Sequence, residues 1–362
     1  MKKIISIPVY ILVIVLCSVF VVSCSEDSPV TPDEEGPYQF DSARYTWSFQ
    51  YFQEEFLTFD AFDTSNIYIL GLNALVKCDG YNFNYNYYNS PSFTPLSMGS
   101  YDKNNIYIGG HQTSVINYGI PILKKWNGTV FEEIPIPNPQ DRRYQISAIN
   151  AINEDEVWFG STKGDLIYYN SGVFEFFRID STFIITMFGT DEIGNYYSVA
   201  SKTVFDSQTV DYLKIYKKIA DNWEWSLVFS EEYPESQYLK EITPSKIKLN
   251  IAGFENNIIE KFTGTDFREV FQIKPFTAYP MTRLSDSNTN YFTLPGKIGS
   301  HGFELFNWNG IKWSREVDFE KIGIYPYRFN MLENVEGKYF ALCSDPFKGI
   351  CFFGKGIKKT VH

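Results

Sequence analysis

The chain has 362 residues, a formal net charge of −11 at pH 7 and 18% aromatic residues. A surface this acidic repels phosphate backbones, so nucleic acid is not expected as a partner. With only five cysteines in the chain, a disulfide-stabilised scaffold is not expected either.

The first 23 residues are typical of an export signal. Lys2 and Lys3 precede an apolar run over residues 4–22, which ends at Ser23-Cys24. Removing residues 1–23 takes away two lysines and no acid, so the formal charge changes from −11 to −13. The alternative is an uncleaved membrane anchor, because the run approaches the roughly 20 residues that span a bilayer. Both interpretations place the rest of the chain outside the cytoplasm.

The four residues Val21-Val22-Ser23-Cys24 resemble the lipobox of bacterial lipoproteins, with valine where that family usually has leucine. The resemblance implies that Cys24 is lipidated and becomes the first residue of the mature protein. Each buried methylene of an acyl chain contributes about 0.8 kcal/mol, so several chains on one cysteine hold a soluble domain on a membrane. We therefore expect a lipoprotein of the outer membrane or cell surface.

Residues 24–37 follow as a stretch rich in proline and acid and poor in apolar side chains. Such a composition cannot bury enough surface to order itself, so we expect a tether. An acidic patch directly after the cysteine also resembles the surface-export signal of some bacterial lipoproteins. The sequence leaves both the periplasmic side and the cell surface open as locations.

Residues 38–362 are expected to form the folded part, and their number exceeds what one simple core usually serves. Two domains or one repeat architecture are therefore expected. Cys78, Cys343 and Cys351 remain in this part. Cys343 and Cys351 could face each other on neighbouring strands and oxidise, or they could be small buried strand residues, which is the simpler interpretation.

A pair of turn residues recurs along this part, flanked by aromatic and β-branched residues. The phrases "KWNGTVF" (Lys125 to Phe131) and "NWNGIKW" (Asn307 to Trp313) are nearly the same. Asn-Gly and Asp-Gly supply the positive φ angles of a two-residue hairpin, so each pair predicts a hairpin. The seven pairs are Asp79-Gly80, Asn127-Gly128, Ser171-Gly172, Asp221-Asn222, Thr263-Gly264, Asn309-Gly310 and Lys355-Gly356.

A second series of strand-like segments lies ahead of these turns, and its mean spacing of about 45 residues is typical of four-stranded propeller blades. The segments begin at Asn66, Asn105, Glu156, Asn195, Lys246, Asn290 and Lys338. Each unit predicts strand a, a polar turn, strand b, a loop, strand c, a glycine turn and strand d. With no 3.6-residue apolar period to compete, the fold predicted is all-β, a single seven-bladed β-propeller of four-stranded antiparallel blades.

A propeller ring must be closed, because its first and last blades would otherwise expose strand edges. The strand-like segment from Arg44 to Phe52 precedes the first complete unit, whereas Ile357 to His362, at the end of the last unit, is a poor strand. We therefore predict that the N-terminal segment pairs into the C-terminal blade and supplies or reinforces its outer edge.

Together these units resemble the β-propeller repeats of bacterial lipoproteins, with recurring D/N-x-Y/W-x-x-G and W-N-G-x-x-W patterns. The resemblance covers essentially Tyr45 to the C-terminus. It implies an architecture and says little of chemistry, because propellers serve hydrolases, lyases and pure binding modules alike.

Motifs for chemistry are missing from the sequence. It has no nucleophile elbow, phosphate loop, dinucleotide-binding glycine motif or zinc-binding helix motif. A multi-histidine metal site would need all of its histidines, His111, His301 and His362. Asp286 to Asn290 resembles the start of a calcium loop but lacks the later glycine and glutamate, so a polar turn explains it better. No catalytic residue, metal or cofactor is predicted.

The variable loops point to a candidate ligand face. Most of the length variation lies between strands b and c, and these loops share one end of a propeller with the d to a connections. Loops that vary on a rigid scaffold usually carry function. Tyrosine and arginine side chains there suit a glycan or a protein partner, although they could equally pack the loops onto the blades. The candidate residues are His111, Arg142, Arg143, Tyr144, Tyr233, Tyr279, His301 and Tyr325.

Three functions remain open from the sequence. The first is a membrane-anchored, non-enzymatic binding or scaffolding module, expected to be a monomer, for a protein or polysaccharide. The second is a glycan-active enzyme, a hydrolase or lyase, with carboxylates at the central channel. The third is a structural subunit of an envelope assembly. The missing nucleophile, metal and cofactor motifs favour the first.

Overall fold

The computed structural model describes residues 42–360 apart from short gaps, all within the second of two units, Met1–Gln39 and Phe40–His362. The predicted signal peptide and tether lie outside the described residues. The gaps are residues 91, 114–118, 138–142, 191–193, 206–208, 220–223, 235–240, 245–248, 254–257, 263, 266, 273–279, 285–290, 296–303, 309–312, 325–327 and 346–348.

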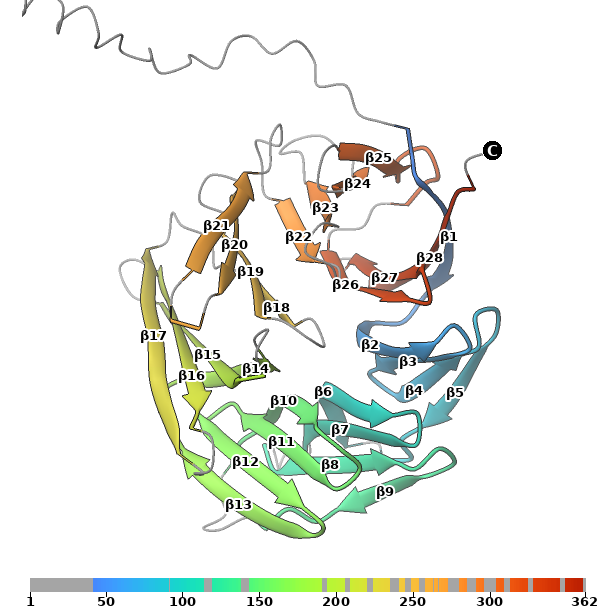
Figure 1. The fold of residues 1–362 in the computed structure, drawn as a ribbon. Helices are drawn as coiled ribbons and strands as arrows, with labels where there is room; N and C mark the ends of the chain where they lie inside the picture. Colours follow the sequence, from blue (N-terminus) through green and yellow to red (C-terminus); the bar gives the residue numbers. More distant parts are fainter. Residues whose placement is uncertain are drawn as a thin grey trace, which may run out of the picture. The chain divides into compact units, whose positions relative to one another are not determined.

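The described residues form strands and turns only, and the strands assemble into seven four-stranded antiparallel sheets (Figure 1). Blade 1 contains β2 (Phe56–Asp63), β3 (Asn66–Gly71), β4 (Ala74–Cys78) and β5 (Phe83–Tyr87). Blade 2 contains β6 (Phe93–Asp102), β7 (Asn105–Gln112), β8 (Pro121–Trp126) and β9 (Phe131–Ile134). Blade 3 contains β10 (Ile146–Ala151), β11 (Glu156–Ser161), β12 (Asp165–Asn170) and β13 (Val173–Arg178). Blade 4 contains β14 (Ile184–Thr190), β15 (Tyr196–Phe205), β16 (Thr209–Lys218) and β17 (Trp225–Pro234).

The remaining three sheets follow the same order. Blade 5 contains β18 (Glu241–Pro244), β19 (Leu249–Gly253), β20 (Ile258–Phe262) and β21 (Phe267–Gln272). Blade 6 contains β22 (Pro280–Leu284), β23 (Tyr291–Pro295), β24 (Glu304–Trp308) and β25 (Trp313–Asp318). Blade 7 contains β26 (Arg328–Val335), β27 (Lys338–Asp345), β28 (Ile350–Lys358) and, as its fourth strand, β1 (Tyr45–Phe52).

The first strands of the sheets form the inner ring of the domain. Each one, from β2 through β6, β10, β14, β18, β22 and β26, contacts the next, and β26 contacts β2 again. This closed circuit is the arrangement of a propeller, in which each sheet packs its faces against two neighbours. The predicted fold class is confirmed.

The apolar core is divided among the interfaces between neighbouring blades. In β3, Ile67, Tyr68, Ile69 and Leu70 are all buried, so the strand is covered on both faces. Ile67 and Ile69 pack in one cluster with residues of blade 7, and Tyr68 and Leu70 pack in another with residues of blade 2. Strands covered on both faces lose the alternation of apolar and polar residues, which explains why the second strands are continuous apolar runs in the sequence.

Glycines near the ends of these second strands allow the close approach of the next blade. A Cβ atom on Gly109 of β7 would lie 2.4 Å from Cγ2 of Ile146 in β10. A Cβ atom on Gly160 of β11 would lie 2.4 Å from Cγ2 of Ile185 in β14. Packing between blades therefore requires glycine after "NIYI" at residues 105–108 and after "EVWF" at residues 156–159. The requirement is repeated at two successive interfaces between blades.

Four of the seven predicted c to d hairpins are confirmed. Gly80, Gly128, Gly172 and Gly264 have φ angles of 91°, 96°, 92° and 100° in turns between the third and fourth strands. Asp79 stabilises its turn by accepting hydrogen bonds from two following backbone N–H groups at 3.0 and 2.7 Å. Asp221-Asn222 and Asn309-Gly310 lie outside the described residues.

The prediction of a seventh hairpin at Lys355-Gly356 is wrong, because both residues lie inside β28. The fourth strand of blade 7 is β1, which pairs with β28 from Tyr45 opposite Lys358 to Phe52 opposite Cys351. The predicted closure of the ring by the N-terminal segment is thereby confirmed. A Cβ atom on Gly354 would lie 2.3 Å from the Phe49 ring, so this glycine provides room for an aromatic side chain of the closing strand.

A buried carboxylate attaches the start of β1 to blade 6. Glu316 of β25 accepts the backbone N–H of Arg44 at 3.1 Å and that of Tyr45 at 2.9 Å, and it accepts the Ser314 hydroxyl at 2.5 Å. Burial raises the pKa of Glu316, and these hydrogen bonds act in the opposite direction. The closing strand is therefore held by hydrogen bonds from two blades.

The structure agrees with the interpretation of the cysteines as small buried strand residues. Cys78, Cys343 and Cys351 are buried free thiols. Burial raises the pKa of Cys351 to about 11, which keeps the thiol protonated at neutral pH.

Candidate functional site

The candidate ligand face predicted from the sequence is described in part. Arg142, Tyr279, His301 and Tyr325 lie outside the described residues, and Tyr233 is described only in its backbone, as part of β17. Three candidates remain: His111, Arg143 and Tyr144.

Blade 2 brings the segments that carry these three residues to one place. His111 is the penultimate residue of β7, and Gly119 in the following loop donates its N–H to the Gln112 carbonyl at 3.0 Å. The Gly119 carbonyl in turn accepts the N–H of Tyr144 at 2.8 Å. The b to c loop and the d to a connection therefore meet at the same end of the sheets.

Only one of the three side chains faces solvent. His111 and Tyr144 are 5% and 3% exposed, whereas Arg143 is exposed. Burial lowers the pKa of His111, so its imidazole is neutral at pH 7. Of these candidates, Arg143 is the one whose side chain is accessible to a ligand.

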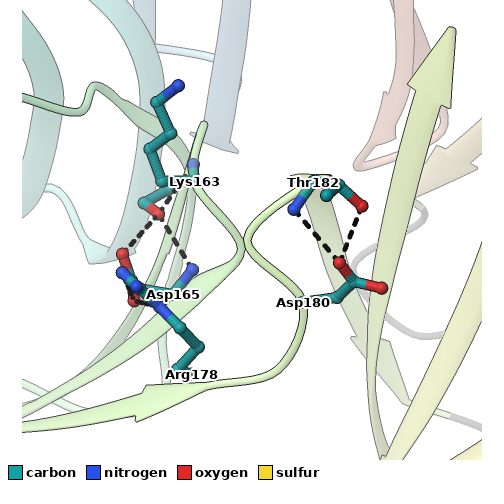
Figure 2. A network of polar contacts seen from close by, with 6 residues as sticks. Lys163, Asp165, Arg178, Asp180 and Thr182 are labelled. Atoms are coloured by element: carbon teal, nitrogen blue, oxygen red, sulfur yellow. Dashed lines mark hydrogen bonds and ion pairs between the residues drawn. The ribbon is translucent and has the colours of Figure 1, made fainter. Parts of the chain in front are cut away.

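Polar contacts also fix the turns and connections at this same end of blades 3 and 4 (Figure 2). The buried Asp165 carboxylate lies 2.7 Å from Nη2 of Arg178, and the Ser161 hydroxyl accepts the backbone N–H groups of Lys163 and Asp165 at 3.1 and 2.9 Å. The b to c turn of blade 3 also approaches the following connection closely, because Ile179 donates its N–H to the Gly164 carbonyl at 3.0 Å.

A second group of polar contacts surrounds Asp180, in the connection from blade 3 to blade 4. Its carboxylate accepts hydrogen bonds from Nζ of Lys214 at 2.9 Å and from the Thr182 hydroxyl at 2.7 Å. Burial acts to raise the pKa of Asp180, but these hydrogen bonds outweigh it and hold the pKa at about 2. The loops at this end are therefore fixed by charge-assisted hydrogen bonds in blades 3 and 4.

A central cavity of about 850 Å³ lies among the inner strands. Inner strands β2, β6, β10, β14 and β26 line it, mostly with their C-terminal halves. Those halves lead into the a to b turns, so the cavity lies toward the end opposite the predicted ligand face. Its lining includes Asp60 and Glu333, a polar pair that sequence periodicity alone does not place at the axis.

Side-chain hydrogen bonds link successive inner strands around this cavity. Glu333 of blade 7 accepts the N–H of Ala61 in blade 1 at 2.8 Å. The other links between inner strands run from blade 1 to blade 4: Ser100 donates to Asp60, Ser97 donates to the Ile146 carbonyl at 3.1 Å, and Ser147 donates to the Ile185 carbonyl at 2.6 Å. Asn150 of β10 also donates to the hydroxyl of Tyr196, in the second strand of blade 4, at 2.8 Å. We call these contacts the axial belt. The inner strands belong to different sheets and are not paired through their backbones, so the axial belt provides hydrogen bonds between them.

The described residues contain neither a cluster of metal-ligating side chains nor a helix that could span a membrane. There, no three His, Cys, Asp or Glu side chains gather closely enough to hold a metal ion. The same part of the chain contains no helix with the length and apolar character needed to cross a bilayer.

Comparison with solved structures supports the propeller fold. No family model and no curated protein match the sequence. Among solved structures, YCF48 bound to a D1 peptide is similar at a TM-score of 0.60 and 12% identity, over 89% of this chain and 100% of that chain. YCF48 from Cyanidioschyzon merolae is similar at a TM-score of 0.54 and 10% identity, over 85% and 98% of the two chains. At these identities the similarity shows the fold alone: the chain is a β-propeller.

Proposed function

We propose that the protein is a non-enzymatic binding module that engages a protein or polysaccharide through the end formed by its b to c loops and d to a connections. In this proposal the lipid on Cys24 anchors it to a membrane on the extracytoplasmic side, at the outer membrane or cell surface. The specific repeat type inferred from the sequence, a lipoprotein propeller with W-N-G hairpins, belongs to the same proposal.

The axial belt is the observation that carries this proposal. Asp60, Ser100, Ser97, Ser147 and Glu333 each take part in a hydrogen bond between neighbouring inner strands, and Asn150 bonds to the second strand of the next blade. These hydrogen bonds stabilise the ring. They explain why polar side chains are present at the axis, and no catalytic role is needed to explain them. Function is then expected at the loop end, where side chains such as Arg143 and Lys163 are exposed.

A protein partner is supported by the fold comparison. One of the similar propellers, YCF48, has been solved with a D1 peptide bound. A rigid ring with variable loops offers the same kind of platform here, and loops on rigid scaffolds commonly carry recognition.

The experiment is affinity capture from envelope extracts with the full mature protein. We expect the double variant Arg143→Glu and Lys163→Glu, at the loop end, to recover at least tenfold less of the ligand than wild type. The matched control, Lys103→Glu and Lys217→Glu, makes the same charge change at the opposite end and should recover as much as wild type. Equal recovery by both double variants would contradict the proposal. Loss of detergent-phase partitioning in Cys24→Ala tests the anchor separately.

One observation favours a second candidate, the glycan-active enzyme. Asp60 and Glu333 line the same cavity, and glycoside hydrolysis uses two carboxylates that flank the bond. Release of reducing ends from a polysaccharide by wild type, lost in Asp60→Asn and in Glu333→Gln, would support this candidate. No release by wild type from any polymer of a broad panel would remove it.

A further inference from the structure

The outer edge of blade 1 is unusually rich in tyrosine and asparagine. Residues 81–89, which contain β5, comprise four tyrosines, four asparagines and one phenylalanine, with no charge. The outer strands β9, β13, β17, β21 and β25 all carry charged residues, whereas β1, the outer strand of blade 7, is uncharged like β5. Charges on edge strands usually prevent association, and the strand residues of this edge supply none in a chain of net charge −11.

Two side chains of this segment are the most exposed tyrosines in the described part of the chain. Tyr81 is 85% exposed and Tyr87 is 60% exposed. The rings of Tyr85 and Tyr87 are near-parallel, with centroids 6.1 Å apart and an interplanar angle of 23°. Tyr85 packs on the core between blades 7 and 1, so it supports the exposed ring of Tyr87 from one side.

A groove of about 490 Å³ lies beside Tyr87, at the end of blade 1 that carries the b to c turn and the connection to blade 2. Its lining is uncharged: Leu72, Asn73, Tyr87, Tyr88, Asn89, Ser90 and Phe93. This is the same end of the propeller to which the proposed function assigns binding.

The walls of the groove are held in place by the fold. The buried Tyr88 donates its hydroxyl to the Gly71 carbonyl at 3.0 Å and its N–H to the Asn73 carbonyl at 3.2 Å. Phe93 is buried behind it, with the two rings edge to face at 5.2 Å. The side chains of Asn73 and Asn89 are exposed on this rigid base, and each amide can donate and accept hydrogen bonds.

We propose that this groove binds a neutral sugar unit of a polysaccharide. The exposed face of Tyr87 stacks on the C–H face of a pyranose ring, and the Asn73 and Asn89 amides exchange hydrogen bonds with its hydroxyl groups. A groove of this volume with one aromatic wall and a few polar groups is typical of a small-ligand site, whereas a stable protein interface needs about 800 Å² on each partner. The inference rests on the proposed function, because it names the ligand class and the part of the loop end that takes it.

The test is co-sedimentation of the full mature protein, in detergent, with insoluble glucan, mannan, xylan and galactan. We expect wild type to sediment with at least one of these polymers. Tyr87→Ala should lower the bound fraction at least tenfold, Asn73→Ala should lower it severalfold, and Tyr87→Phe should keep most of it because the stacking ring remains. Tyr101→Ala is the matched control, since Tyr101 is 49% exposed and lines the central cavity; it should bind as wild type does.

Several results would overturn the inference. They are failure of wild type to sediment with any of the four polymers, equal loss in Tyr87→Ala and Tyr101→Ala, or complete loss in Tyr87→Phe. Capture of an envelope protein that depends on Tyr87 while no polymer binds would assign the groove to a protein instead. Because the capture experiment for the proposed function uses Arg143 and Lys163, it can succeed when the sugar site fails. Equal thermal midpoints of all variants exclude misfolding as the cause.

Discussion

Blades 3 and 7 have the same four-stranded sheet but are assembled in different ways. In blade 3, the Ser171-Gly172 hairpin joins β12 to β13, so the outer strand is placed by a turn. In blade 7, the outer strand β1 comes from the other end of the chain and pairs with β28 over eight residues. Bringing distant segments together costs loop-closure entropy, which a hairpin largely avoids. Blade 7 must therefore recover that free energy from contacts that β1 alone supplies.

Removal of β1 should have the largest effect on the stability of the protein. Tyr45 and Phe52 of β1 are buried, and each buried aromatic side chain contributes about 2–3 kcal/mol. We expect a chain that begins at residue 53 to melt about 10 °C or more below one that begins at residue 38. Circular dichroism during heating measures the difference. Equal melting temperatures would show that blade 7 does not need its closing strand.

Substitution of glycines that allow close packing should lower the free energy of unfolding by an intermediate amount. The loss should be larger in blade 3 than in blade 7. In Gly160→Ala the new methyl group meets Ile185, which is fully buried and cannot move aside. The expected loss in the free energy of unfolding is about 2–3 kcal/mol.

The counterpart in blade 7 is Gly354→Ala, where the new methyl group meets the half-buried ring of Phe49. That ring can turn toward solvent, so we expect a loss of about 1 kcal/mol. Urea unfolding of both variants measures the two losses. A larger loss for Gly354→Ala would reverse the comparison and show that the closing seam is the more rigid interface.

The remaining expected effect concerns Asp180, next to blade 3, and it depends on pH. Its pKa falls from 3.8 to about 2 on folding, so its stabilising contribution is fully present above about pH 4 and is lost as the pH falls toward 2. Each pKa unit corresponds to about 1.4 kcal/mol, and the carboxylate is 27% exposed and partly screened. We therefore expect Asp180→Asn to lower the free energy of unfolding by about 1–2 kcal/mol at pH 7.

Urea unfolding at pH 7 and near pH 2.5 tests this dependence. The difference between wild type and Asp180→Asn should shrink at the lower pH. The exposed Glu175 of β13 provides a control, because Glu175→Gln should change stability little at either pH. A difference that stays constant with pH would contradict the assignment of the low pKa to Asp180.

The candidate site was harder to predict than the fold. Tyrosine and arginine residues in variable loops indicated the loop end, yet Tyr144 and His111 are buried there while Arg143 is exposed. Loop composition does not distinguish a side chain that packs from one that faces solvent, because both kinds favour amphipathic residues. The Tyr/Asn-rich segment of blade 1 was available in the sequence as an uncharged run, but its importance depends on the groove beside it.

The repeat of about 45 residues, most of the hairpin glycines and the pairing of the N-terminal strand into the last blade could be predicted from the sequence. These features follow from local backbone preference and from strand patterns that recur in every unit. Three features could not be predicted: Lys355-Gly356 continues a strand, the cavity lies at the a to b end, and Glu333 bonds to Ala61, 272 residues away. Such contacts arise when separate sheets are packed around one axis, and local φ and ψ preferences carry no information about that packing.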